Sequence, residues 1–259
     1  GERERPRVFV LDFQGDVRAS AVRSLRDEIT AVLQVARTSD EVVIRLESPG
    51  GVVHGYGLAA SQLDRIRQRG IRLTVAVDKV AASGGYLMAC VADRIIAAPF
   101  AIIGSIGVVM QIPNFHRLLQ HNNIDFEMHT AGEFKRTLTL FGENTEEGRA
   151  KLRAELEDTH ALFKEYVAEH RPQLELATVA TGEHWFGRRA LALNLVDELM
   201  TSDDYLLNKI THYDVFRVRI KTPKPLLERL TQKAALAIRG NPAALASAAD
   251  HPLSKTHMR

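Results

Sequence analysis

Ser83 lies in the segment AASGG (residues 81–85), which follows a predicted strand. A serine between a strand and a Gly-Gly turn can present its hydroxyl to a substrate, so Ser83 is a candidate nucleophile. A free serine hydroxyl is almost never ionised near neutral pH, and it becomes reactive only beside a base. The identity of that base therefore decides which chemistry the chain can perform.

Histidine and lysine are the residue types that can supply this base. The chain has ten histidines, and His54, close after a Gly-Gly turn, is the strongest candidate, but none has an obvious acidic partner. Lys135 lies 52 residues after Ser83 in an apolar stretch. Burial disfavours the ammonium form, which lets a lysine act as a base. Lys79 is a weaker rival because an extended strand would hold it far behind Ser83, and the residues alone leave a solvated Lys135 as the more common alternative.

Two further segments can complete such a site. The segment SPGG (residues 48–51) directly follows a buried strand, where glycines let the backbone approach a substrate closely. Its amides, together with the amide of Gly84, can form an oxyanion hole, whose donors are fixed before charge develops on the substrate. Ser105, within IGSIG (residues 103–107), can orient a lysine amine through a hydrogen bond, or it is an ordinary turn serine.

The segments that must position these residues alternate between strand and helix patterns. Strands or short apolar segments are predicted over residues 7–13, 41–47, 71–77, 94–98, 101–103, 125–130 and 214–220. Helices are predicted over residues 20–36, 56–69, 84–92, 113–120, 146–169 and 188–199, with Leu58, Leu63 and Ile66 inward on the second. This alternation predicts an α/β fold of right-handed βαβ units around a mainly parallel sheet. Such sheets place their sites at the carboxyl ends of strands.

The composition is that of an ordinary soluble globular protein. At 259 residues, with 45% hydrophobic and 25% charged residues, the chain is long enough for one large domain or two small ones. A net charge of +2 gives no argument for nucleic acid as a partner, and no transmembrane helix or signal peptide is visible. The only cysteine, Cys90, cannot form an internal disulfide or a metal site alone, and its apolar surroundings predict a buried structural thiol.

We expect three segments along the chain. Residues 1–6 are predicted to be a disordered N-terminal remnant, and their start at Gly1 suggests that an upstream anchor is missing. Residues 7–220 are predicted to form one α/β domain with a helical extension. Residues 221–259 begin with apolar residues at helical spacing among Lys and Arg, followed by a composition typical of disorder. We expect this first part to form a basic amphipathic helix. Such a helix packs on the domain or on a neighbouring subunit or, as a less common alternative, lies on a membrane surface.

Five motifs together resemble the signal peptide peptidase A family. They are SPGG (48–51), AASGGY (81–86), GSIGV (104–108), GEFK (132–135) and GRRALALNLVDEL (187–199). The continuation RTLTLFGENTEEG (136–148) resembles the SohB branch of that family in particular. One such motif can arise by chance, but five in the expected order cover roughly residues 7 to 220. The chain is therefore identified as a member of this family of serine-lysine peptidases.

The resemblance implies a role for each candidate residue. It makes Ser83 the nucleophile, Lys135 the general base, Ser105 the hydroxyl that orients the lysine, and Gly51 and Gly84 the oxyanion donors. It implies a ClpP/crotonase-like fold with a helical C-terminal extension, and no metal or cofactor. The expected substrates are peptides, such as signal-peptide remnants and membrane-protein fragments.

The same resemblance implies an assembly and a location. Family members form homo-oligomeric rings or domes, in which the serine and the lysine can come from adjacent protomers. They usually carry an N-terminal membrane anchor. We therefore expect a bacterial inner-membrane protein, anchored by a segment outside this sequence, with the catalytic domain on the periplasmic side.

Three alternative functions are compatible with the same residues. A ClpP-type Ser-His-Asp peptidase is a weak one, because Val108 occupies the position where its histidine is expected. A crotonase-type enzyme would act on acyl-CoA with the same oxyanion hole and would need neither Ser83 nor Lys135. A non-catalytic, membrane-associated scaffold would keep the two residues without using them.

Overall fold

The computed structural model describes residues 5–132 and 134–220. The expectations for residues 1–4 and for the tail over 221–259 lie outside the described residues. Residues up to Arg219 belong to one compact unit, and a second unit begins at Ile220.

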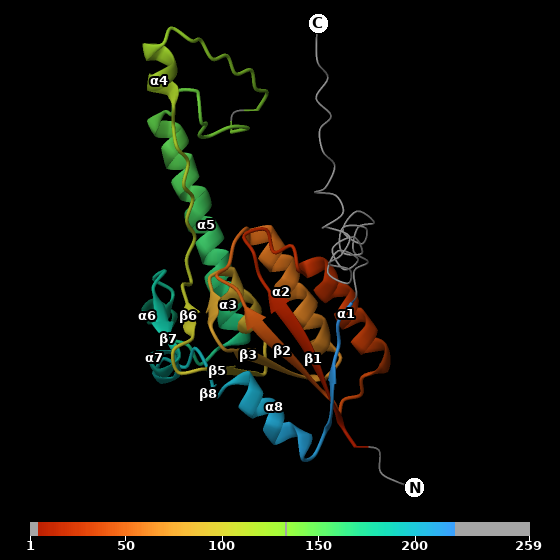
Figure 1. The fold of residues 1–259 in the computed structure, drawn as a ribbon. Coiled ribbons are helices and arrows are strands. Elements are labelled where there is room, and N and C mark those ends of the chain that lie inside the picture. Colours follow the sequence, from red (N-terminus) through yellow and green to blue (C-terminus); the bar gives the residue numbers. More distant parts are fainter. Residues whose placement is uncertain (1–4, 133, 221–259) are drawn as a thin grey trace, which may run out of the picture. The chain divides into compact units, whose positions relative to one another are not determined.

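A six-stranded sheet, parallel throughout, forms the centre of the first unit (Figure 1). Its order is β8-β5-β3-β2-β1-β9. The strands are β1 (Arg7–Gln14), β2 (Glu41–Glu47), β3 (Arg72–Val77), β5 (Arg94–Ala97), β8 (Glu198–Leu199) and β9 (Asp214–Arg217). The predicted α/β fold with a mainly parallel sheet is confirmed.

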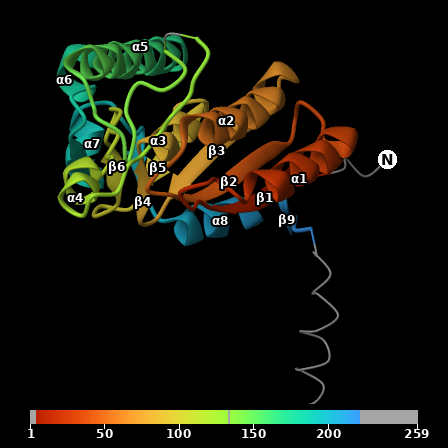
Figure 2. The same cartoon turned by 90° about the horizontal axis from the view of Figure 1, so that it is seen from above.

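Helices cover both faces of this sheet, as a parallel sheet requires. Figure 2 shows α1 (Val22–Val35), α2 (Val53–Gln68) and α3 (Gly84–Ala89) on one face and α8 (Ser202–Ile210) on the other. The larger core lies under α1, α2 and α3, where Ile29, Leu63 and Ile44 are fully buried. The predicted inward position of Leu58 is wrong: this side chain is 43% exposed, because it faces away from the sheet on α2.

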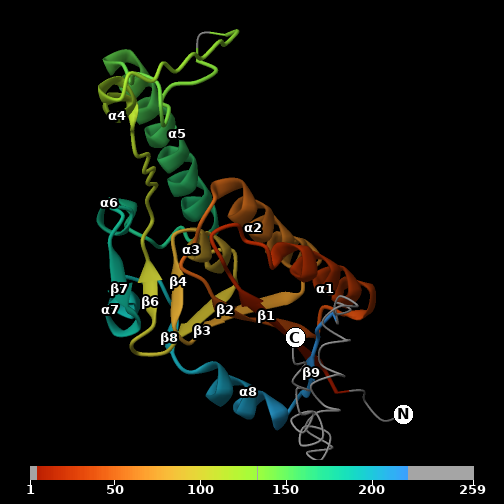
Figure 3. The same cartoon turned by 45° about the horizontal axis from the view of Figure 1, so that its top comes forward.

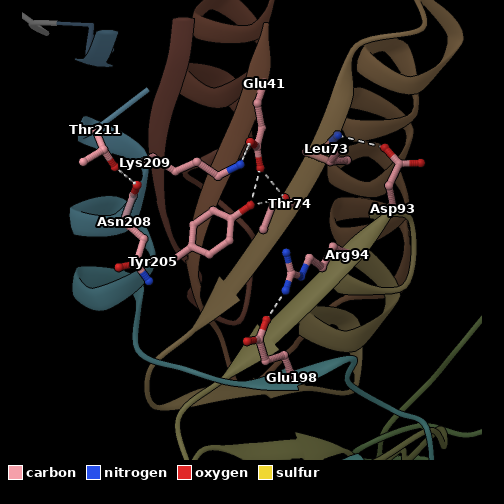
Figure 4. Close-up of polar contacts among 10 residues, drawn as sticks. All are labelled: Glu41, Leu73, Thr74, Asp93, Arg94, Glu198, Tyr205, Asn208, Lys209 and Thr211. Atoms are coloured by element: carbon pink, nitrogen blue, oxygen red, sulfur yellow. Dashed lines mark hydrogen bonds and ion pairs between the residues drawn. The ribbon is translucent and has the colours of Figure 1, made fainter. Parts of the chain in front are cut away.

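A buried carboxylate fixes α8 to the sheet. Glu41 on β2 is 2% exposed and accepts hydrogen bonds from Thr74, Tyr205 and Lys209 (Figure 4). Arg94 and Glu198 form a further ion pair between β5 and β8. These contacts join strands and a helix that are far apart in the sequence, and they bury polar groups only where each has a partner.

A second, three-stranded sheet is also present (Figure 3), and its first two strands end just before Ser83 and Ser105. It consists of β4 (Val80–Ala82), β6 (Ile102–Gly104) and β7 (His184–Phe186). β4 and β6 are parallel and pair Ala82 with Gly104, whereas β6 and β7 are antiparallel. The carboxyl ends of β4 and β6 therefore lie side by side.

The remaining elements follow β6 in the sequence. They are α4 (His116–His121), α5 (Glu146–His170), α6 (Leu176–Val179) and α7 (Gly187–Ala192). The strand predicted over 125–130 is wrong: this segment forms no regular structure and its side chains are exposed, because no neighbouring strand pairs with it. The helix predicted over 188–199 ends at Ala192, and Asn194, with a φ of 60°, breaks the helical path before β8.

Two further features of the described residues bear on the sequence predictions. Cys90 is fully buried and unpaired, which confirms a structural thiol, and burial raises the pKa of this thiol well above its ordinary value. Among the described residues, no helix combines the length and the apolar character needed to cross a membrane.

Candidate active site

Ser83 occupies the sharp turn between β4 and α3. Its φ of 52° and ψ of −120° lie in a region that residues other than glycine rarely adopt. Its amide donates to the Gly104 carbonyl at 2.8 Å, and its carbonyl accepts from the Leu87 amide at 3.0 Å. Within the described part of the chain the Ser83 hydroxyl makes no capping bond to α3. A strained strand-to-helix turn of this kind exposes a nucleophilic serine.

The glycine turn after β2 lies directly against Ser83. A Cβ atom built on Gly50, whose φ is +90°, would lie 2.8 Å from Ser83 Cβ and 2.7 Å from the Gly84 nitrogen. A Cβ on Gly51 would lie 2.1 Å from the Val17 carbonyl oxygen. Only glycine fits at these two positions, and Gly50, the residue before Gly51, thereby packs directly against Ser83 and the Gly84 amide nitrogen.

Ser105 lies immediately after β6, beside the Ser83 turn. Its amide donates to the Glu183 carbonyl at 2.7 Å, and its Oγ donates to the Gly182 carbonyl at 3.4 Å. Its φ of 51° is again in the left-handed region. The sequence-predicted residues Ser83, Gly51, Gly84 and Ser105 thus come together at the carboxyl ends of neighbouring strands.

His160 on α5 holds the segment that follows Ser105. Its Nε2 lies 3.2 Å from the Ile106 carbonyl oxygen, which also accepts from the Gly182 amide at 3.1 Å. Because a carbonyl can only accept, Nε2 carries the proton in this contact. His160 falls within the helix predicted over residues 146–169, but the sequence gave no sign of this hydrogen bond, which depends on tertiary structure.

Lys135 lies at a distance from this cluster. Its side chain is exposed, and its amide donates to the Gly132 carbonyl at 3.2 Å. The neighbouring Phe134 ring contacts Lys151 in the first turns of α5, with 5.2 Å between the Nζ atom and the ring centroid. Lys151 precedes His160 by nine residues, which is about 13.5 Å along a helix axis.

None of the contacts described for Lys135 and its neighbour Phe134 involves Ser83 or Ser105. Phe134 contacts the N-terminal turns of α5. Figure 3 shows these turns and α4 away from the six-stranded sheet. Among the described residues, Ser83 and Lys135 share no hydrogen bond.

The rival bases are engaged elsewhere or exposed. Lys79 Nζ lies 3.1 Å from both carboxylate oxygens of Glu47 in a surface ion pair. His54 is exposed on the first turn of α2. Within the ranges 5–132 and 134–220, no three or more His, Cys, Asp or Glu side chains gather in a way that could hold a metal ion.

Comparison with known proteins gives two family matches. The family model described as Peptidase family S49 matches residues 65–215, and the one described as Peptidase family S49 N-terminal matches residues 1–63. Together they span most of the described chain.

Curated relatives are similar at high identity. The "Probable protease SohB" of Haemophilus influenzae is 60% identical over 227 residues, which are 88% of this chain and 64% of the relative. The protein of the same name from Buchnera aphidicola subsp. Acyrthosiphon pisum is 61% identical over 227 residues, 88% of this chain and 68% of the relative. The chain thus spans about two thirds of the length of these relatives.

Solved structures share the fold at low sequence identity. A serine-to-alanine mutant of the 1510-N membrane-bound stomatin-specific protease is 14% identical, with a TM-score of 0.56 over 85% of this chain and 100% of that chain. A lysine-to-alanine mutant of the same protease, in complex with a substrate peptide, is 15% identical, with a TM-score of 0.56 over 89% of this chain and 100% of that chain.

Proposed function

The chain belongs to peptidase family S49, in its SohB branch, and from this premise we propose that it is a serine endopeptidase with a Ser-Lys dyad. Ser83 is the nucleophile and Lys135 is the general base. The observation that carries the proposal is the strained turn at Ser83, with the Gly50–Gly51 turn packed against Ser83 and Gly84. An acyl-CoA enzyme of the crotonase type would need the glycine amides but not a nucleophile held in a strained conformation.

The reaction is acyl transfer in two steps. The unprotonated amine of Lys135 takes the Ser83 proton while the serine oxygen bonds to the scissile carbonyl carbon. The amides of Gly51 and Gly84 stabilise the oxyanion, a contribution of about 3–4 kcal/mol for one such donor elsewhere. The lysine then protonates the leaving amine, and water activated by the same lysine hydrolyses the acyl-enzyme. Ser105 orients the lysine amine.

The position of Lys135 supports a dyad shared between protomers. The segment around it exposes large apolar side chains to solvent, and a contiguous surface of this kind is typical of an interaction site. They include Val109, Met110, Phe115, Leu118, Ile124, Phe126, Met128, Phe134 and Phe141. In a homo-oligomeric ring or dome, this surface packs on a neighbour, which removes Lys135 from water and brings it to the partner's serine.

Substrates and location complete the proposal. Signal-peptide remnants and membrane-protein fragments suit a peptidase that is held at the bacterial inner membrane, with its catalytic domain on the periplasmic side. The membrane-bound stomatin-specific protease that shares this fold is one of its solved neighbours. We expect the site to accept extended apolar peptides as substrates.

The test uses two single variants, Ser83→Ala and Lys135→Ala, and an unfolded apolar peptide substrate. We expect each variant to lower kcat by at least about 10³-fold, as loss of a member of a catalytic unit does. We also expect an acylating inhibitor to label Ser83 in the unmodified protein. Peptidase activity that survives Lys135→Ala refutes the dyad. Absence of labelling together with acyl-CoA turnover by Ser83→Ala would favour the crotonase-type alternative.

A further inference from the structure

A chain of buried hydrogen bonds runs beneath the glycine turn. The Gly50 amide donates to Ser48 Oγ at 3.1 Å, Ser48 Oγ lies 2.6 Å from the Tyr56 hydroxyl, and that hydroxyl donates to the Asp16 carbonyl at 2.8 Å. Ser48 and Tyr56 are both 0% exposed. Neither side chain can therefore reach the substrate or exchange its partners for water.

The direction of each bond in this chain is determined. The Asp16 carbonyl can only accept, so the single hydroxyl proton of Tyr56 is directed at it. Ser48 must then donate its own proton to the Tyr56 oxygen, which leaves a lone pair of Ser48 Oγ for the Gly50 amide. Burial raises the pKa of Tyr56, so the hydroxyl keeps its proton at neutral pH. Each hydroxyl proton in this chain of hydrogen bonds has an acceptor, and such satisfied buried networks specify a single geometry.

The same two residues contact the backbone segments on either side of Ser83. A Cβ atom on Gly84 would lie 2.4 Å from Cγ of the Tyr56 ring, so the first residue of α3 rests on that ring. The backbone of Ser48 pairs with β4, since its carbonyl accepts from the Ala82 amide at 3.0 Å, one residue before the nucleophile. Tyr56 and Ser48 thus connect the strand before Ser83, the helix after it and the glycine turn.

The Gly50 and Gly51 amides have different surroundings. The Gly50 amide is directed into the protein, at Ser48 Oγ. The Gly51 amide, the next donor along the chain, has no hydrogen-bond partner within the part of the chain that the structure describes, and Gly51 is exposed. The Gly50 amide is therefore held inside the protein, while the adjoining Gly51 amide is left free to meet a ligand.

We propose that Tyr56 and Ser48 are positioning residues, whose hydrogen-bonded hydroxyls hold the Gly50–Gly51 turn so that the Gly51 amide meets the oxyanion of the substrate. This inference rests on the proposed function. It assigns roles to two residues that contact neither the substrate nor Lys135. Their effect reaches the reaction through the Gly51 and Gly84 amides.

The test removes one oxygen at a time. Tyr56→Phe keeps the ring under Gly84 and deletes only the hydroxyl, and Ser48→Ala deletes the acceptor of the Gly50 amide. The matched control is Tyr166→Phe on α5, because within the described residues the buried Tyr166 hydroxyl has no hydrogen-bond partner. We expect Tyr56→Phe and Ser48→Ala to lower kcat roughly 10- to 100-fold with little change in KM, the effect of a misplaced oxyanion donor.

Two readouts separate positioning from a general loss of structure. A peptide aldehyde, which forms a tetrahedral adduct with the nucleophile, should lose affinity by about the same factor as kcat/KM, whereas a product peptide should bind as before. Hydrogen exchange of the Gly50 amide should accelerate in Tyr56→Phe and Ser48→Ala but not in Tyr166→Phe. The double variant should resemble either single one, since both interrupt the same chain.

The outcomes distinguish this inference from the proposed function. Unchanged kcat/KM and unchanged Gly50 exchange in a folded Tyr56→Phe protein overturn the inference. An equal loss of product-peptide binding would overturn it too, because it indicates a structural role. Faster Gly50 exchange in a protein whose unmodified form hydrolyses no peptide would refute the proposed function and leave the hydrogen-bond chain supported.

Discussion

The backbone amide of Ser83 lies 2.8 Å from the carbonyl oxygen of Gly104, so the turn that holds the proposed nucleophile is tied to the strand that leads to Ser105. This bond extends the parallel pairing of Ala82 with Gly104 by one residue. The framework of two paired strands imposes a φ of 52° on Ser83, which a free serine would avoid. Backbone strain of this kind persists only where surrounding structure determines it.

Relief of this backbone strain should be measurable as an increase in the free energy of unfolding. Glycine adopts positive φ without the clash of a Cβ atom, so we expect Ser83→Gly to be more stable than Ser83→Ala by about 1 kcal/mol. Both variants should be inactive. The free energies of unfolding, from urea denaturation, provide the comparison.

At a control position inside a helix, the difference in stability between the glycine and alanine variants should have the opposite sign. Ser61 lies within α2 and is exposed, and there glycine should be less stable than alanine by about 1 kcal/mol. If Ser83→Gly is no more stable than Ser83→Ala while the Ser61 pair differs as expected, Ser83 is not strained in solution.

Mixing two inactive variants should restore activity if the dyad is shared between protomers. An oligomer assembled from equal amounts of Ser83→Ala and Lys135→Ala contains sites with an intact serine from one protomer and an intact lysine from its neighbour. Random assembly makes about a quarter of the sites complete, because each partner is correct half of the time. We expect activity of that order after the two proteins are dissociated and reassembled together.

The control for this mixture is the double variant carrying both substitutions. Mixed with Ser83→Ala alone, it can form no complete site and should remain inactive. A mixture of the two single variants that stays inactive, despite exchange of subunits shown by mass, would place both residues of the dyad in one chain.

The sequence predicted well those features that depend on short-range pattern. β2 has the bounds expected from its β-branched run, residues 41–47, because a strand buried on both faces needs a continuous apolar segment. Ser83 and the glycine turns were located for the same reason, since turns after strands have their own residue signals. The strand expected over 125–130 failed because a strand also needs a partner, and no local pattern indicates one.

Tertiary contacts account for what the sequence did not reveal. The sequence marked Tyr56 only as the first residue of a predicted helix, and its hydroxyl gains a role because Ser48 and Asp16 come from separate segments. The apolar neighbours of Lys135 allowed a buried amine but left a solvated one as the more common alternative, and in the single chain Lys135 is exposed and Phe134 is 46% exposed. The apolar residues of one segment do not by themselves tell whether the same chain or a neighbouring protomer covers them.

The buried pair of Glu41 and Lys209 should stabilise the fold, and this stabilisation should be lost at alkaline pH. Lys209 Nζ donates to Glu41 Oε2 at 2.5 Å, and Tyr205 donates to Oε1 at 2.5 Å. Lys209→Met would leave the buried carboxylate without its cation, which lowers the free energy of unfolding by about 3–5 kcal/mol for such pairs. Lys79→Met, which breaks an exposed pair with Glu47, should change it by less than about 1 kcal/mol.

The pH dependence of that stability follows from the direction of the shift. Burial lowers the pKa of Lys209, but the hydrogen bond and charge of Glu41 outweigh it and raise the pKa above 10.5. The stabilisation is therefore fully present below pH 10.5 and is lost as pH rises through the higher folded value. Unfolding measured in urea from pH 8 upward should show this loss in the unmodified protein and in Lys79→Met but not in Lys209→Met. An equal alkaline loss in Lys209→Met would mean that another group is responsible.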